Sequence, residues 1–230
     1  YERLVRSVDE MTDLPATERE ALDAEFRIDE PVPDTVQRSE DGTVKHLWRL
    51  SDGELVESVL IPTDRRLTLC ISSQAGCAMG CTFCATGWGG CDRNLTAGEI
   101  VGQYRASRRW ADENEYGAIS NIVYMGMGEP LDNYEQVTNS IRILLDESGQ
   151  NFSGRRITVS TSGIIPKMVQ LGHDVPVNLA ISLSATTDAT RTRLIPINKV
   201  WDIETLLQGL RDFPLASRRR ITVEYVMLEG

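Results

Sequence analysis

Short apolar runs alternate with longer amphipathic stretches from about residue 67 to the end of the chain. The apolar runs have the length of β-strands, and the stretches between them repeat apolar residues at α-helical spacing. Repeated strand–helix units with apolar strands are typical of a parallel sheet that helices cover. The strands are predicted at residues 67–72, 120–126, 156–161, 177–183 and 221–228. The pattern predicts an α/β fold, a barrel or a doubly wound sheet, with its active site at the carboxyl ends of the strands.

Three of the predicted helices have clear signals. Thr96 and Glu99 have the spacing of a capping box, and Ile100, Val101 and Tyr104 then follow on one helical face. Apolar stripes mark the other two helices, at Val137, Ile141, Leu144 and Leu145 and at Ile203, Leu206, Leu207 and Leu210.

The first part of the chain follows a different pattern. Residues 15–26 are predicted to form a helix, with a capping box at Thr17 and Glu20. Residues 29–41 are rich in proline and acidic residues and are predicted to be a linker. Residues 43–61 are predicted to form a hairpin that turns at an Asp-Gly pair.

Charge divides the chain at about the same place. The net charge is −10, and residues 1–60 carry 7 Lys or Arg against 16 Asp or Glu, whereas residues 61–230 carry 17 against 18. We therefore expect an accessory region at 1–60 and a catalytic core at 61–230. A nucleic-acid enzyme usually has a basic surface, so composition alone argues mildly against an RNA partner.

Composition also limits the cellular setting. No apolar run approaches the length of a membrane span, and no secretory signal is visible at the start of the sequence. Of the five cysteines, three are crowded together, which in a cytosolic chain indicates a metal or catalysis rather than a disulfide framework.

Those three cysteines are the main chemical signal. Cys77, Cys81 and Cys84 have the spacing C-x3-C-x2-C in a loop after the first core strand. Thiolates suit iron–sulfur clusters and zinc, and three ligands leave one iron of a cubane open for chemistry. The alternative is a structural zinc completed by Cys91 or Cys70. The aromatic residue before the last cysteine favours the cluster.

This motif resembles the signature of the radical S-adenosylmethionine (SAM) superfamily. Further runs are similar to the RlmN-type methyltransferases, which modify adenine carbon 2 in 23S rRNA and tRNA. These runs are Met11-Thr12-Asp13-Leu14-Pro15, Ser72-Ser73-Gln74-Ala75-Gly76-Cys77, Arg93-Asn94-Leu95-Thr96, Met125-Gly126-Met127-Gly128-Glu129-Pro130, Ser160-Thr161-Ser162-Gly163, Ile195-Pro196-Ile197-Asn198-Lys199 and Val223-Glu224-Tyr225-Val226-Met227-Leu228.

The resemblance implies a partial (β/α) TIM-like barrel with the N-terminal helix and hairpin outside it. It also implies a [4Fe–4S] cluster on Cys77, Cys81 and Cys84, SAM as second cofactor, and 23S rRNA and tRNA as substrates. An electron donor such as flavodoxin would be the protein partner of a monomeric cytoplasmic enzyme with no membrane contact.

By the same resemblance, residues at the strand ends contact SAM. They are Gly128, Glu129, Ser160, Ser182, Leu183 and Ser184. In the Gly-Glu-Pro loop, glycine permits close approach of the backbone and a carboxylate can accept from the SAM ammonium. The family commonly has histidine where this chain has Ser184, so only a backbone contact is expected there.

Two catalytic residues are implied as well. Glu57 takes the position of the proton acceptor. Cys70 takes the position of a cysteine that pairs transiently, as a disulfide, with a methyl-carrying cysteine near the C-terminus. No cysteine follows Cys91 in this sequence, which also lacks an initial Met, so we expect a fragment without the carrier and the last strand.

Two alternatives remain open from the sequence. One is the sister activity at adenine carbon 8, which confers antibiotic resistance and resembles this family closely. The other is a zinc-stabilised RNA-binding module without catalytic chemistry.

Overall fold

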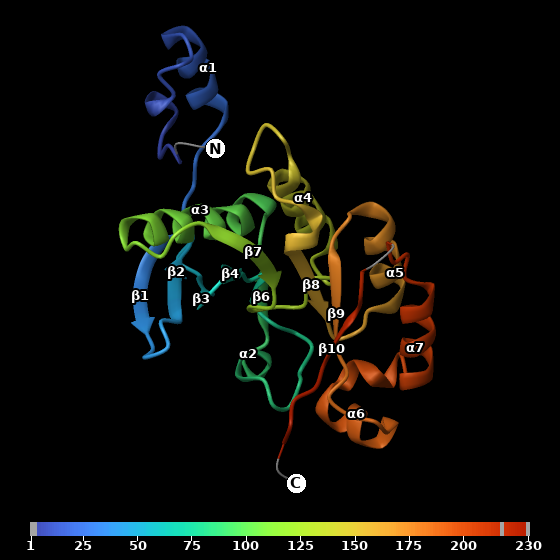
Figure 1. Ribbon diagram of the computed structural model, residues 1–230. Coiled ribbons are helices and arrows are strands. Elements are labelled where there is room, and N and C mark those ends of the chain that lie inside the picture. The colour runs from blue at the N-terminus through green and yellow to red at the C-terminus, as the bar shows by residue number, and fades with distance from the viewer. Residues whose placement is uncertain (1–3, 217–218, 229–230) are drawn as a thin grey trace.

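A single eight-stranded sheet organises the computed structural model, which describes residues 4–216 and 219–228. Its order is β1-β2-β3-β4-β7-β8-β9-β10, and the last five strands run parallel to one another. All five predicted core strands are present, at β4 (Arg66–Cys70), β7 (Ile119–Tyr124), β8 (Ile157–Thr161), β9 (Asn178–Ser182) and β10 (Thr222–Glu224). The last one is shorter than predicted, because residues 225–228 are not part of it. The sheet stays open, so the expected partial (β/α) barrel is also confirmed (Figure 1).

Helices connect the parallel strands and cover the sheet (Figure 1). They are α3 (Ala97–Glu113), α4 (Tyr134–Leu145), α5 (Ile165–Asp174), α6 (Asp188–Leu194) and α7 (Ile203–Asp212), with short 3-10 segments η2 (Gly154–Arg156) and η3 (Pro196–Lys199). The capping box at Thr96 and Glu99 is present. In α7 the predicted stripe is wrong at Leu207, which is 41% exposed while Leu206 is buried.

Three antiparallel strands extend the sheet on its N-terminal side. They are β1 (Val32–Arg38), β2 (Val44–Arg49) and β3 (Leu55–Thr63). The hairpin is therefore not outside the barrel as expected, because β3 pairs directly with β4. The prediction of a linker at 29–41 is wrong for residues 32–38, which form strand β1. Strand β1 was missed because all its side chains are exposed and it includes Pro33, which an edge strand tolerates.

The N-terminal segment lies beyond α3, on the side away from the sheet (Figure 1). It contains η1 (Val8–Glu10) and α1 (Ala16–Glu25), and α1 buries no residue. The predicted capping box at Thr17 is wrong, since the helix begins at Ala16 and has no side-chain cap. Glu30 connects this segment to the sheet domain, with carboxylate oxygens 2.8 Å from Arg105 Nε and 2.6 Å from Arg109 Nη2.

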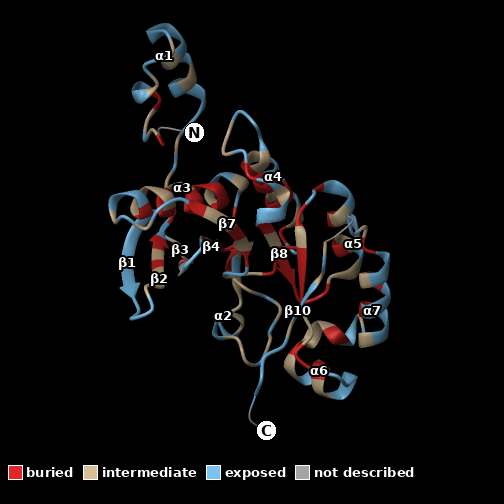
Figure 2. Ribbon diagram, in the orientation of Figure 1, coloured by how far each residue is buried: buried red, intermediate tan, exposed pale blue. Residues whose placement is uncertain are grey.

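The hydrophobic core lies on the central strands and the inner faces of the helices (Figure 2). Trp48, Leu60, Ile122 and Ile141 are among its largest fully buried side chains. No helix in the described part of the chain combines the length and the apolar character needed to cross a membrane.

One core residue is titratable. His46 on β2 stacks on Trp48 and meets the edge of Trp110, with both centroid distances 4.7 Å. It is fully buried, and neither ring nitrogen has a hydrogen-bond partner among the described residues. Burial, together with the positive charge of Arg38, lowers the pKa of His46 from 6.5 to about 4.

This lowered pKa predicts a loss of stability in acid. The neutral ring is the folded form, so the stabilisation is complete above about pH 6.5 and is lost as the pH falls toward 4. Between pH 8 and pH 5 we expect the free energy of unfolding to fall by about 2 kcal/mol more in the natural chain than in His46→Phe. Urea unfolding at each pH measures it. His173→Gln, which removes an exposed histidine, is the control and should behave like the natural chain. The same acid loss in His46→Phe would refute the prediction.

Candidate active site at the carboxyl edge of the sheet

The three clustered cysteines lie on a loop held by a small two-stranded ribbon, which the sequence analysis did not anticipate. The ribbon pairs β5 (Gln74–Gly76) with β6 (Cys91–Asn94), and the loop between them contains α2 (Ala85–Trp88). The Cys77 N–H donates to Gly90 O at 2.6 Å and closes the base of the loop. The loop lies below the sheet in Figure 1, on the same side as α6.

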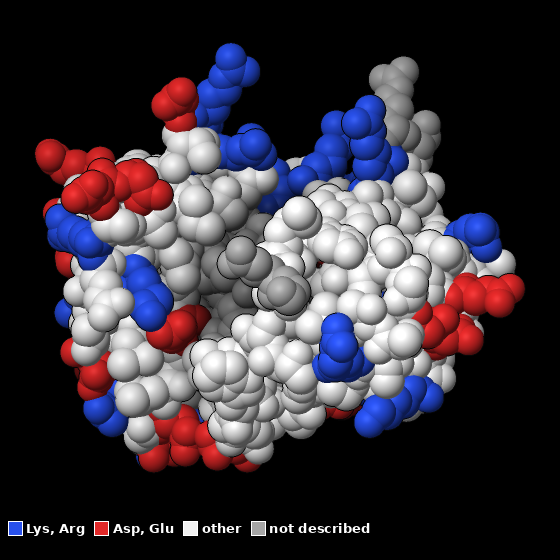
Figure 3. Space-filling model, turned by 90° about the horizontal axis from the view of Figure 1, so that it is seen from below, with Lys and Arg blue, Asp and Glu red and all other residues white. Residues whose placement is uncertain are grey.

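This loop and the ends of the parallel strands enclose a cavity of about 250 Å³. The cavity brings together seven of the predicted site residues: Cys77, Cys81, Cys84, Gly128, Glu129, Ser160 and Ser182. Figure 3 views the molecule from this end, where few charged side chains surround a central hollow. The expectation that the cysteine loop, Glu129, Ser160 and Ser184 converge at one end of the sheet is met for the cysteines, Glu129 and Ser160, but Ser184 does not line the cavity.

The cysteine thiols are crowded and partly buried. Burial raises the pKa of Cys81 to about 11, and repulsion from Cys77, Cys84 and Glu129 adds to the effect. Burial likewise raises the pKa of Cys77, which lies near the same carboxylate. A bound cation reverses this balance, because metal coordination favours the thiolate form. The chemistry of this set of donors therefore fits a metal group that neutralises three thiolates.

The two cysteines that could complete a structural zinc site lie outside the cavity. Such a site would need a fourth ligand beside Cys77, Cys81 and Cys84, and neither Cys91 nor Cys70 lines the cavity. A [4Fe–4S] cluster would be held by the three thiolates alone.

Glu129 lines the cavity and is held in place by hydrogen bonds within the protein. It is 4% exposed, and burial raises its pKa. One carboxylate oxygen accepts from the Leu131 N–H at 3.0 Å, and the other accepts from the N–H and hydroxyl of Ser162 at 2.8 and 2.9 Å. The carboxylate joins the loops after β7 and β8. Its expected contact with the SAM ammonium group stays a prediction.

Glu224 is the site residue that the sequence analysis left without a role. It ends β10 and lines the cavity. Its Oε2 accepts from the Ser160 hydroxyl at 2.7 Å and the Ser182 hydroxyl at 3.3 Å. No strand-end signal was available here, because the fifth strand was predicted to run to residue 228, which places Glu224 in its interior, whereas the observed strand ends at Glu224.

The remaining predicted residues lie beside the cavity and do not line it. Leu183 packs against the core, and Ser184 is buried with a positive φ of 52° just after β9. Glu57 is directed at solvent and pairs with Lys45, with Oε1 and Nζ 2.9 Å apart. The Cys70 thiol is buried, and burial raises its pKa to about 12.

All five cysteines are free thiols, so a disulfide at Cys70 stays a prediction. The backbone N–H of Met125 donates to the Cys70 thiol, and Met125 itself lines the cavity. Cys70 is thus one residue removed from the site.

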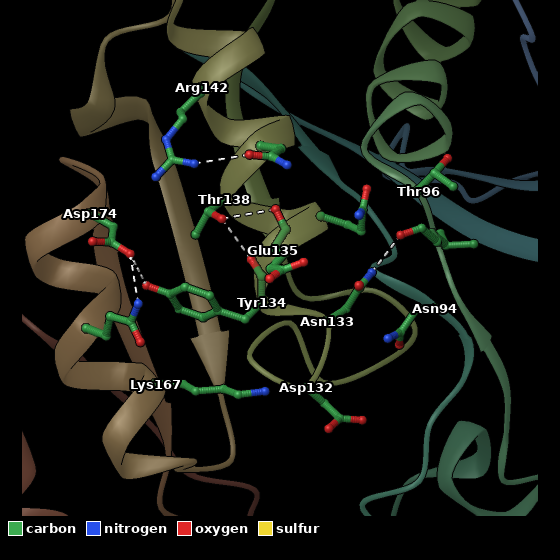
Figure 4. A pocket seen from close by; sticks show the side chains of 14 residues that line it. Asn94, Thr96, Asp132, Asn133, Tyr134, Glu135, Thr138, Arg142, Lys167 and Asp174 are labelled. Carbon is green, nitrogen blue, oxygen red and sulfur yellow. Dashed lines mark hydrogen bonds between the residues drawn. The ribbon is translucent and has the colours of Figure 1, made fainter.

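A larger cavity, of about 930 Å³, lies between the starts of α3 and α4 and the side of α5 (Figure 4). Polar side chains line this cavity, and several of them form hydrogen bonds with one another. For example, the Tyr134 hydroxyl donates to Asp174 Oδ2 at 2.7 Å. It contains none of the predicted site residues. Size alone therefore does not identify the functional site.

Comparison with known proteins agrees with this geometry. Residues 71–230 match the model of the radical SAM superfamily. The chain belongs to this superfamily. A crystal structure of a radical SAM methyltransferase from Sphaerobacter thermophilus superimposes with a TM-score of 0.92 at 44% identity, covering 100% of this chain and 68% of that one.

Curated relatives narrow the comparison further. The chain is 52% identical over 228 residues to the dual-specificity RNA methyltransferase RlmN of Anaeromyxobacter sp. (strain Fw109-5), and 51% identical over 230 residues to that of Geobacter sulfurreducens. These matches cover 97% and 100% of this chain and 60% and 62% of the relatives. The chain thus spans about three fifths of the length of the curated relatives it matches.

Proposed function

We propose that this chain is the core of a radical SAM RNA methyltransferase that methylates adenine carbon 2 in 23S rRNA and tRNA. The observation that carries the proposal is one cavity that joins Cys77, Cys81 and Cys84 to the polar ends of β8, β9 and β10. The relatives' names support the substrate class. Adenine carbon 2 lies between two ring nitrogens and is electron-poor, so ordinary methyl transfer fails there and a radical route is needed.

The cofactors would bind to named residues of the cavity. Cys77, Cys81 and Cys84 would hold a [4Fe–4S] cluster, which when bound supplies the electron that splits SAM into methionine and a 5′-deoxyadenosyl radical. The Glu129 carboxylate and backbone carbonyls near Gly128 would accept from the SAM ammonium. Ser160, Ser182 and Glu224 would bind polar groups of SAM by hydrogen bonds.

Two further residues keep the roles that family resemblance gives them. Glu57 would accept a proton from the substrate adenine, and its exposure leaves it accessible to an RNA base. Cys70 would exchange with a methyl-carrying cysteine through a disulfide. Leu183 and Ser184 would contribute backbone contacts beside SAM. An electron donor such as flavodoxin in the cytoplasm would supply the electron, to a monomeric enzyme.

The test is anaerobic reconstitution followed by two assays. If the cluster binds, we expect a brown protein with about four irons per chain. With reductant and SAM, cleavage to 5′-deoxyadenosine and methionine is expected. Colourless protein with one zinc would overturn the proposal in favour of an RNA-binding module. For the longer protein, mass spectrometry of the methylated adenosine separates carbon 2 from carbon 8, and an 8-methyl product would establish the sister activity.

A further inference from the structure

A buried guanidinium lies directly behind the cysteine loop. Arg191 on α6 is 1% exposed. Its Nη2 donates to Ser162 O at 2.7 Å and Ser182 O at 3.0 Å, and its Nη1 donates to Asn198 Oδ1 at 3.0 Å. Arg191 thereby joins the loops that follow β8 and β9, at the wall of the proposed site.

The charge of Arg191 has no direct counter-ion. No ion pair in residues 4–216 and 219–228 includes it, and its buried Nε has no hydrogen-bond partner there. Asp188 lies one turn earlier on α6, and its charge favours the charged form of Arg191. It forms no ion pair with Arg191, however, and its Oδ1 accepts from Asn198 and the Ile203 N–H. Glu129 reaches Arg191 only through Ser162, which contacts both. A buried cation without a direct ion pair is costly, so a further negative group nearby would stabilise it.

Arg191 and the cysteine loop lie at the same cavity. Ser162 and Ser182, whose carbonyls accept from Arg191, line that cavity together with the three cysteines. The chain after Arg191 packs on the cysteine loop, since the Thr82 N–H donates to Leu194 O at 3.0 Å. Glu129 lines the same cavity and places a carboxylate on its wall.

We propose that Arg191 is a positioning residue for the iron–sulfur cluster, whose buried charge offsets the thiolates and Glu129 and raises the cluster's reduction potential. The inference rests on the proposed function, because it needs a cluster at Cys77, Cys81 and Cys84. Reduction adds a negative charge, and a nearby fixed cation stabilises the reduced form more than the oxidised form. No step of the reaction requires Arg191 to touch SAM or RNA.

The experiment is a redox titration of the loaded protein with a chemical reductant, followed by electron paramagnetic resonance. Arg191→Met should lower the equilibrium constant for one-electron reduction at least tenfold, a shift of about 59 mV to more negative potential. Arg191→Lys keeps the charge but loses the hydrogen-bonding fork, and should change the constant less than threefold. Arg193→Met, on the exposed face of the same helix, is the matched control and should change nothing.

The outcomes separate the two proposals. If the natural chain does not bind a cluster, the proposed function itself is refuted. A cluster with the same potential in Arg191→Met and in the natural chain would overturn the role of Arg191 alone. If Arg191→Met does not bind the cluster but Arg191→Lys does, the result supports the proposal that the positive charge at this position is what matters. Loss of the cluster in both variants would mean that the hydrogen bonds are what matters, and would refute the proposal.

Discussion

Replacing any one of Cys77, Cys81 or Cys84 with alanine is expected to lower the iron content from about four per chain to less than one. Each of these thiols lines the same cavity, and no other cysteine does. Loss of one ligand leaves two thiolates for three irons, which does not hold a cubane. Iron analysis and the visible absorbance of anaerobically reconstituted protein measure the effect.

Cys91→Ala is the matched control for this series. Cys91 lies at the start of β6, close enough to interact electrostatically with Cys77, but it does not line the cavity. The variant should therefore keep its four irons. Circular dichroism on all four variants separates ligand loss from unfolding. Normal iron content in any of the three cavity variants would refute the assignment of the cluster ligands.

The sequence was most informative where a residue's neighbours along the chain decide its structure. The apolar strand runs and the Thr96–Glu99 cap are local signals, and both were confirmed as structural features. The convergence of Ser160 and Ser182 on the cysteine loop also followed, because parallel strands bring their carboxyl ends to one edge.

The sequence was least informative where partners are distant. Strand β1 owes its structure to backbone pairing with β2, and its exposed side chains carry no alternation that could reveal it. The hydrogen bonds of the Glu129 carboxylate could not be predicted, because Ser162, which donates to it, lies 33 residues later. The burial of Arg191 could not be predicted from the sequence, because an arginine in a helix is usually exposed. Only the fold shows that it is buried behind the loop after β9.

The loop after β7 depends on a glycine that no other residue can replace without movement. Gly128 has a φ of +98°, and a Cβ there would lie 2.6 Å from Gln74 Cβ and 2.8 Å from Gln74 N. Gln74 belongs to β5, the strand that leads into the cysteine loop. The Glu129 N–H donates to Gln74 Oε1 at 2.8 Å, so this contact fixes the Gly-Glu-Pro loop against the cysteine ribbon.

We therefore expect Gly128→Ala to lower the free energy of unfolding by about 3–5 kcal/mol, from backbone strain and steric overlap together. Gly53→Ala isolates the first effect, because Gly53 has a similar φ of +95° with nothing within 4 Å of its Cβ position, and it should lose only about 1–2 kcal/mol. Urea unfolding gives both values. Calorimetric titration with SAM should show at least tenfold weaker binding in Gly128→Ala alone, because the displaced loop carries the proposed ammonium acceptors. Equal stability losses in the two variants would mean that the loop moves away from Gln74 freely, and unchanged SAM affinity would remove this loop from the proposed site.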